Sequence, residues 1–141
     1  MVEQRYLTRA EFNQLLKEAP EDETMFIRDY LKGSGVEAYD FFEDFGFEKD
    51  GIVIDGRPIY VAILTGNEKG EKELWTIVNS DVKEQFTLYK ISKRQVYKWL
   101  EKYKRIFSTM QKINPKNLEW VKRLGFKQTS EEDDTITFVL S

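Results

Sequence analysis

The spacing of apolar residues in the first third of the chain is that of helices. Thr8 and Glu11 stand three residues apart, the spacing of a capping box. Phe12, Leu15 and Leu16 then follow at the three- and four-residue steps of one helix face. These residues predict a helix that begins at Thr8. The other elements expected in this third are a short strand over residues 5–7, a helix end at residues 20–23, and helices over residues 25–31 and 36–47.

The middle of the chain carries the pattern of strands. Asp55-Gly56 separates two apolar runs, residues 52–54 and 59–64, and this predicts a hairpin with a tight turn. The second run is apolar throughout, which indicates a strand covered on both faces. A turn over residues 66–70 and a third strand over residues 74–78 complete a meander.

The last third alternates helices with strands. Ser92 and Gln95 repeat the capping-box spacing and predict the start of a helix. Asn114 and Pro115 have the signature of a second helix start, and Gly125 ends that helix as a C-terminal glycine. Strands are expected over residues 107–113, from residue 126, and over residues 135–140.

The order of these elements predicts the fold class. The chain has 141 residues, the length of one compact domain, and no repeat or linker divides it. Helices placed among strands after a meander predict an α/β (α+β) fold. We expect a mixed central sheet of about six to seven strands with about four helices on both faces. Residues 1–141 are expected to form a single domain.

Composition excludes several kinds of active site. The chain contains no Cys and no His, so disulfides, thiolate nucleophiles, imidazole bases and zinc thiolate sites are excluded, and no metal site is predicted. Carboxylates, Lys and Tyr remain as acids and bases. No signal-peptide pattern occurs near the N-terminus, and no apolar run approaches the roughly 20 residues that span a bilayer. We therefore expect a soluble protein made inside a cell, without a membrane partner.

Charge is distributed in blocks that the net value of -3 conceals. Residues 1–82 carry a net charge of -9, residues 83–127 a net charge of +10, and residues 128–141 a net charge of -4. The basic block has three interpretations: a solvated helix face, an anion site formed by Lys83, Lys90, Lys93 and Arg94, or a nucleic-acid surface. Nucleic acid is the least favoured, because Trp99 lies on the apolar stripe and not among the basic residues.

The segment from Asn114 to Phe126 reads Asn-Pro-Lys-Asn-Leu-Glu-Trp-Val-Lys-Arg-Leu-Gly-Phe. Its Asn and Gly, eleven residues apart, and its Leu-Gly-Phe ending resemble the GNAT superfamily of N-acetyltransferases. Residues 74–126 look still more like the acetyltransferase-like proteins of short-tailed bacteriophages, of which an internal virion protein is one. The resemblance implies a GNAT-like fold and acetyl-CoA as the cofactor of any catalytic activity.

The resemblance also implies where coenzyme A would bind. The family holds the pyrophosphate with a glycine-rich loop between its fourth strand and the next helix, and residues 79–92 contain no glycine. Asn114 is expected to bond the pantetheine arm, or else to act only as a helix cap. Ser92 is a phosphate ligand or, again, only a cap. The candidate cofactor-binding residues are Asn79, Ser92, Lys93, Arg94 and Asn114.

The catalytic residues that the resemblance implies are only partly present. Glu73, beside the predicted strand 74–78, is the candidate general base, but a solvated strand-end charge is the favoured interpretation. The family's tyrosine acid, four residues before the glycine, is replaced by Val121. Tyr89, Tyr97 and Tyr103 are possible substitutes, and packing is the favoured role for all three.

Two functions follow from these observations. The first is a non-catalytic bacteriophage protein of GNAT fold that acts through a protein partner in virion assembly or host takeover. It would need no cofactor and would be located in the host cytoplasm or in the virion. The alternative is an acetyl-CoA-dependent N-acetyltransferase with an atypical cofactor loop. We favour the first, because the glycine loop and the tyrosine acid are both missing.

Overall fold

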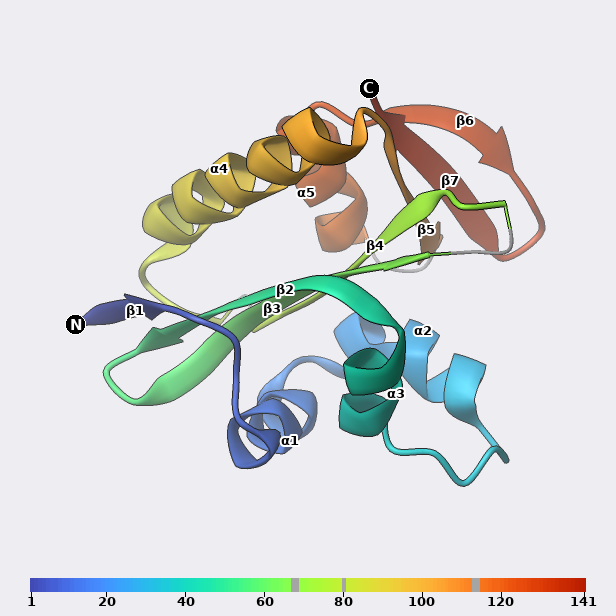
Figure 1. The fold of residues 1–141 in the computed structure, drawn as a ribbon. Helices are drawn as coiled ribbons and strands as arrows, with labels where there is room; N and C mark the ends of the chain where they lie inside the picture. The colour runs from blue at the N-terminus through green and yellow to red at the C-terminus, as the bar shows by residue number, and fades with distance from the viewer. Residues whose placement is uncertain (67–68, 80, 113–114) are drawn as a thin grey trace.

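A computed structural model of the chain describes residues 1–66, 69–79, 81–112 and 115–141, without the side chains of residues 115–117. Within these residues the chain forms one sheet with helices on both faces (Figure 1). The strands are β1 Val2–Gln4, β2 Gly46–Ile54, β3 Arg57–Gly66, β4 Lys72–Val78, β5 Ile106–Gln111, β6 Lys127–Glu131 and β7 Thr135–Leu140. The helices are α1 Arg9–Glu18, α2 Glu21–Leu31, α3 Ala38–Phe45, α4 Gln85–Tyr103 and α5 Pro115–Leu124.

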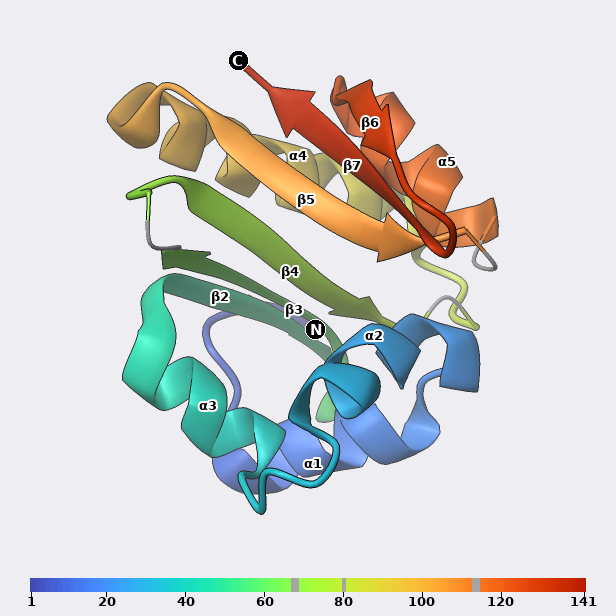
Figure 2. The same cartoon turned by 90° about the vertical axis from the view of Figure 1, so that its right-hand side faces the viewer.

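The sheet is mixed, as predicted. Its strand order is β1-β2-β3-β4-β5-β7-β6, and all neighbours are antiparallel except β4 and β5, which are parallel. Helices α1, α2 and α3 cover one face, and α4 and α5 cover the other (Figures 1 and 2). The fold class is confirmed, with seven strands and five helices in the described part of the chain.

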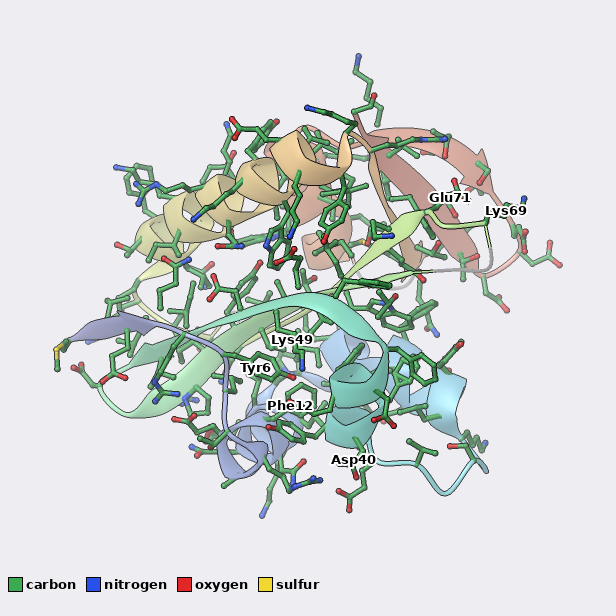
Figure 3. The ribbon with its side chains drawn as sticks, in the orientation of Figure 1. Tyr6, Phe12, Asp40, Lys49, Lys69 and Glu71 are labelled. Atoms are coloured by element: carbon green, nitrogen blue, oxygen red, sulfur yellow. The ribbon has the colours of Figure 1, made fainter. Side chains whose placement is uncertain are left out.

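Each face of the sheet has its own hydrophobic core. On one face Phe12 of α1 and Phe42 of α3 pack against the sheet, and Figure 3 shows Tyr6 and Phe12 in the layer between the sheet and these helices. On the other face Val96 of α4 and Leu124 of α5 pack against β3 and its neighbours. Because β3 lies between the two cores, its residues 58–65 are all buried, which confirms the prediction of a strand covered on both faces.

Two local predictions are confirmed at the level of single hydrogen bonds. The Glu11 backbone N–H donates to Thr8 Oγ1, and the Thr8 N–H donates to Glu11 Oε1, so the capping box is complete. Hydrogen bonds from Arg5 to the Glu11 carboxylate lower its pKa to about 2. The Asp55-Gly56 turn also forms, with both residues at positive φ.

Several predicted boundaries are wrong. The helix expected over residues 36–47 spans only Ala38–Phe45, and Gly46 and Phe47 already belong to β2. Residues 5–7 are not a strand, and the edge strand β1 lies three residues earlier, at Val2–Gln4. The acidic residues 21–23 open α2, because carboxylates are stabilised at the positive end of a helix dipole. Helix α4 begins at Gln85 and not at Ser92, since Leu88 continues its buried stripe one turn further toward the N-terminus.

Candidate active site

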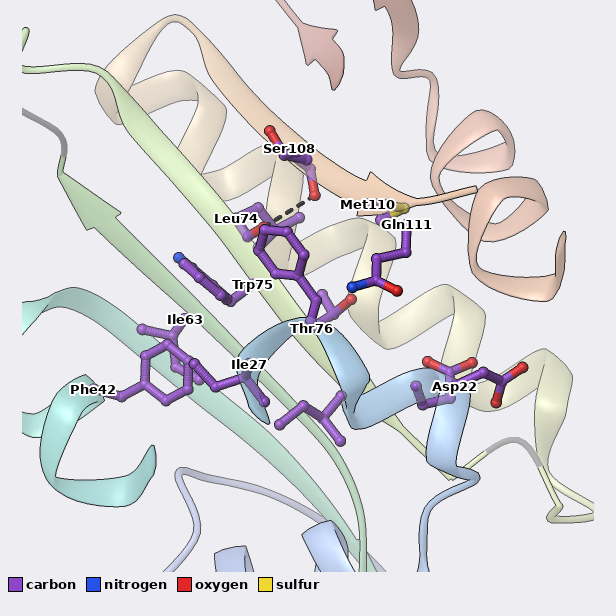
Figure 4. Close-up of a pocket in the computed structure, with 14 residues that line it drawn as sticks. Asp22, Ile27, Phe42, Ile63, Leu74, Trp75, Thr76, Ser108, Met110 and Gln111 are labelled. Carbon is purple, nitrogen blue, oxygen red and sulfur yellow. Dashed lines mark hydrogen bonds between the residues drawn. The ribbon is translucent and has the colours of Figure 1, made fainter. Parts of the chain in front are cut away.

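The parallel strands β4 and β5 pair over only two positions. Lys72 is opposite Ile106 and Glu73 is opposite Phe107, and no further backbone pair joins these two strands. At the next position a side chain joins the two strands in place of a backbone pair: Ser108 Oγ donates to the Leu74 carbonyl at 3.0 Å (Figure 4). The two strands are therefore paired only near their amino ends, which we call the closed end, and no backbone pairs join them toward their carboxyl ends. We call the gap between the unpaired parts of the two strands the β4–β5 opening.

Ser108 is expected to brace the closed end of this opening. Its side chain is buried, so the Ser108→Ala variant leaves the Leu74 carbonyl without its partner. We expect a loss of about 1–2 kcal/mol in the free energy of unfolding, measured by urea denaturation. The control is the Thr109→Ala variant. It removes a hydroxyl that bonds the Thr137 hydroxyl on β7 at 3.1 Å, but it leaves the hydrogen bond between Ser108 and Leu74 in place. An unchanged stability in Ser108→Ala would contradict this role.

A pocket lies at the β4–β5 opening on the side of α2. Figure 4 shows Trp75 and Thr76 of β4, Gln111 of β5 and Asp22 of α2 around it. Helices α4 and α5 follow the carboxyl ends of β4 and β5. Crevices outside the carboxyl ends of parallel strands are where open α/β sheets bind ligands. The opening is therefore the candidate active site.

Glu73, which the sequence offered as a candidate base but favoured as a solvated charge, lies inside β4 at the closed end of the opening. Its neighbours across the sheet are Thr65 and Phe107. Since side chains alternate along a strand, Glu73 points to the same face as Trp75, which lines the pocket. Glu73 is half-buried and forms no hydrogen bond or ion pair with any residue that the structure describes. Burial raises the pKa of Glu73 to about 7, the range that suits a base at neutral pH.

Asn79 provides a hydrogen-bond donor at the carboxyl end of β4. Its side chain is buried, and its Oδ1 accepts a hydrogen bond from the Asp81 N–H at 3.2 Å. Its Nδ2 has no partner among the described residues. A buried donor without a partner is uncommon in folded proteins, so Asn79 is a candidate to bind a ligand in the opening.

The segment from Asn79 to α4 lacks the glycines of a phosphate cradle. Glu84 precedes the helix, and no side chain of the described residues is recorded as capping the first N–H groups of α4. These groups and the helix dipole favour an anion, whereas the carboxylates of Asp81 and Glu84 disfavour one. Lys83 is the cation of this segment, and it is exposed.

The structure separates the other predicted cofactor-binding residues. Ser92 is fully buried in the middle of α4 and its Oγ donates to the Tyr89 carbonyl at 3.0 Å, so it caps no helix and is turned away from any phosphate. Lys93 and Arg94 are exposed on the third turn of α4. Asn114 lies outside the described residues. Apart from Ser92, whose predicted cap is wrong, these residues stay predictions.

The tyrosines that could replace the family's acid are engaged elsewhere. Tyr89 donates to the Arg123 carbonyl at 2.8 Å, Tyr97 donates to the Leu124 carbonyl at 2.7 Å, and Tyr103 donates to a Glu48 carboxylate oxygen at 2.7 Å. These bonds agree with the packing role that the sequence favoured. Val121, at the family's acid position, is buried in the core.

Sequence reasoning missed two contributors to the site. Ser108 and α2 belong to it only because β4 and β5 diverge and α2 lies beside the gap, and no motif marks either one. Within the described ranges no group of acidic side chains gathers in a way that would hold a metal ion. None of the helices described is both long and apolar enough to cross a membrane.

Comparisons with known proteins identify the fold. No protein-family model and no curated protein sequence matches the chain. Solved structures match it closely in shape at low identity. The GNAT domain of S. lividans PAT has a TM-score of 0.69 and 15% identity, covering 99% of this chain and 89% of its own. The ribosomal-protein-S18-alanine N-acetyltransferase from Escherichia coli has a TM-score of 0.68 and 13% identity, covering 99% and 93%. The PaiA N-acetyltransferase from Thermoplasma acidophilum, solved in complex with coenzyme A, has a TM-score of 0.68 and 13% identity, covering 99% and 98%.

These neighbours correct the functional prediction. They carry the names of N-acetyltransferases or of a GNAT domain, and nothing in them indicates a bacteriophage or a non-catalytic role. The prediction of a non-catalytic bacteriophage protein is therefore wrong, and the alternative of an N-acetyltransferase fits the neighbours better. The predicted protein partner stays a prediction. The chain has the fold of the GNAT N-acetyltransferases.

Proposed function

We propose that the protein is an acetyl-CoA-dependent N-acetyltransferase with an atypical cofactor loop. One observation carries the proposal: Glu73, a half-buried carboxylate without a partner in the described residues, lies at the closed end of the β4–β5 opening, and burial raises its pKa to about 7. Burying a carboxylate without a compensating bond costs stability. Such a cost is typical of catalytic sites and hard to explain as packing.

The residues present fit the thioester end of coenzyme A. They do not form the glycine-rich loop that would hold its phosphates. At the β4–β5 opening, the diverging strands leave room beside backbone groups, and the buried Asn79 Nδ2 has no partner among the described residues. At the start of α4 the glycine cradle is missing. These features support entry of the thioester end of the cofactor at the β4–β5 opening, and its phosphates require other contacts.

The chain's own chemistry in this reaction depends on Glu73. Acetyl-CoA supplies an activated acetyl group. An acceptor amine enters mainly as an ammonium ion, and the Glu73 carboxylate takes its proton, either directly or through one water. The neutral nitrogen would then take the acetyl group from the bound thioester, with a C–N bond formed as the C–S bond breaks, and the second proton that the nitrogen loses would pass to the departing thiolate. Thiolate is a good leaving group, so its departure does not require the tyrosine that Val121 replaces.

Acetyl-CoA binding tests the proposal directly. We expect isothermal titration calorimetry to detect acetyl-CoA at micromolar to sub-millimolar concentration, and a thiol-release assay with a panel of amines to show turnover. The panel contains a peptide with a free N-terminus, a lysine peptide, a polyamine and an aromatic alkylamine. The Glu73→Gln variant is the control that keeps binding and loses turnover. Absence of heat at millimolar acetyl-CoA would overturn the proposal.

A further inference from the structure

A shallow groove runs along the outer face of α4. Its lining residues are Phe86, Tyr89, Lys90, Lys93, Arg94 and Tyr97. They recur at helical steps, so they share one face of the helix. We call this set the α4 groove.

The floor of the α4 groove is aromatic. Phe86 is 73% exposed and belongs to neither core. Tyr89 and Tyr97 are held by hydrogen bonds to the last carbonyls of α5. A large apolar ring left in water on an ordered helix suggests a binding surface. The floor therefore offers flat rings for another flat ring to stack on.

The rim of the α4 groove carries positive charge that nothing in the described chain neutralises. Lys90 Nζ lies 5.2 Å from the centre of the Phe86 ring, and Lys93 Nζ lies 5.8 Å from that of Tyr89. Neither lysine nor Arg94 forms an ion pair with a described residue. Elsewhere on α4, Lys102 is paired with Glu48 at 2.6 Å. An aromatic floor with unpaired cations suits a flat ring that bears negative charge.

The α4 groove starts at the N-terminal end of α4, a short distance along the chain from the carboxyl end of β4. Phe86 is the second residue of α4, and the segment before it leaves the carboxyl end of β4. From Phe86 to Tyr97 the helix rises about 16 Å. A ligand with one end in the opening and a long charged tail can therefore lie with that tail along the groove.

From this arrangement we infer that the α4 groove binds the adenosine 3′,5′-bisphosphate end of coenzyme A. The adenine ring stacks on Phe86, and the phosphates lie against Lys90, Lys93 and Arg94. This inference rests on the proposed function. It also accounts for the missing glycines, because cationic side chains on α4 replace the backbone N–H groups that a glycine loop would supply.

Binding of cofactor fragments tests the inference without reference to turnover. We expect calorimetry to detect adenosine 3′,5′-bisphosphate alone, and dephospho-coenzyme A to bind about tenfold more weakly than coenzyme A. The Phe86→Ala variant is expected to weaken coenzyme A binding about 5- to 100-fold, with recovery in Phe86→Trp. Acetyl-pantetheine, which lacks the nucleotide, should bind Phe86→Ala and the parent chain equally.

A second set of variants tests the contribution of the positive charge on the rim of the α4 groove. The Lys93→Ala/Arg94→Ala double variant should weaken coenzyme A binding and flatten its dependence on salt. Lys98→Ala removes a charge from the same helix but outside the groove, and should bind as the parent does. All of these side chains are exposed, so the variants should keep the parent's thermal midpoint.

The outcomes separate the two proposals. Acetyl-CoA binding that is unaffected by Phe86→Ala and by the double variant overturns the α4 groove and leaves the N-acetyltransferase standing. Binding of adenosine 3′,5′-bisphosphate to the groove without any binding of acetyl-CoA overturns the N-acetyltransferase and, with it, the assignment to coenzyme A. A single-stranded oligonucleotide that displaces the bisphosphate and binds more tightly also overturns the assignment.

Discussion

Replacing Glu73 with Gln is expected to lower kcat/KM for acetyl transfer by about 10²- to 10⁴-fold. Glutamine keeps the size of the side chain but cannot accept the proton of the acceptor ammonium. Acetyl-CoA binding should not change, because the carboxylate acts on the amine. The measurement is thiol release under kcat/KM conditions, with the amine that the panel selects as acceptor.

The pH profile shows whether Glu73 is the base. Burial raises the pKa of Glu73 to about 7, so the fraction of base present rises with pH and is complete above that value. We expect kcat/KM of the parent chain to rise to a plateau above pH 7, and this rise to be absent from Glu73→Gln. The Glu101→Gln variant, an exposed carboxylate on α4, should keep both rate and profile. A Glu73→Gln profile identical to that of the parent would contradict the assignment.

The same variant should make the folded chain more stable at high pH. The folded state raises the pKa of Glu73 from 4.5 to about 7, so it binds this proton more tightly than the unfolded state does. The stability of the parent chain therefore falls as pH rises from about 4.5 to 7 and then stays level. Glutamine does not ionise. We expect Glu73→Gln to exceed the parent by about 2 kcal/mol at pH 8, allowing for partial exposure, and by nothing at pH 4.5.

Stability and activity that change in opposite directions distinguish a base from a structural residue. A carboxylate that held β4 in place would cost stability when replaced, at every pH. Urea denaturation of both chains at pH 4.5 and pH 8 makes this comparison, because all other titrating groups are shared and cancel.

Much of the fold could be predicted from the sequence because its signals are local. The Thr8–Glu11 capping box and the Asp55-Gly56 turn each depend on a few adjacent residues, and both form as predicted. Ser92 shows the limit of such signals. Its spacing to Gln95 is that of a cap, but Leu88 earlier in the chain packs into the core and extends the helix past it. Tertiary packing decided where α4 begins.

The candidate site was only partly predictable, for a related reason. Glu73 was named as a candidate base from its position beside a predicted strand, where a solvated charge was favoured, because the burial that raises its pKa depends on the sheet around it. Ser108 and the α4 groove carry no sequence motif, since one depends on the divergence of β4 and β5 and the other on tyrosines anchored by α5. The sequence showed the positive charge of residues 83–127. It did not show the aromatic floor of the α4 groove, because Phe86 lay outside the predicted helix.

The second large effect is expected at Gly125, the glycine of the Leu-Gly-Phe ending. Gly125 has a φ of 106°, and a Cβ built there would lie 2.5 Å from the Tyr97 hydroxyl oxygen. Gly125→Ala therefore combines backbone strain with a clash against a hydroxyl that caps α5. We expect a loss of about 3 kcal/mol in the free energy of unfolding, measured by urea denaturation.

A double-mutant cycle separates the two causes. Gly56→Ala is the matched control, because Gly56 has a φ of 81° and open space where its Cβ would lie, so only strain remains; we expect about 1 kcal/mol there. In the Tyr97→Phe background the hydroxyl is gone and the nearest ring carbon, Cζ, lies 3.8 Å from the added Cβ. The cost of Gly125→Ala should then fall toward that of Gly56→Ala. An equal cost with and without the hydroxyl would show that backbone strain alone requires glycine at this position.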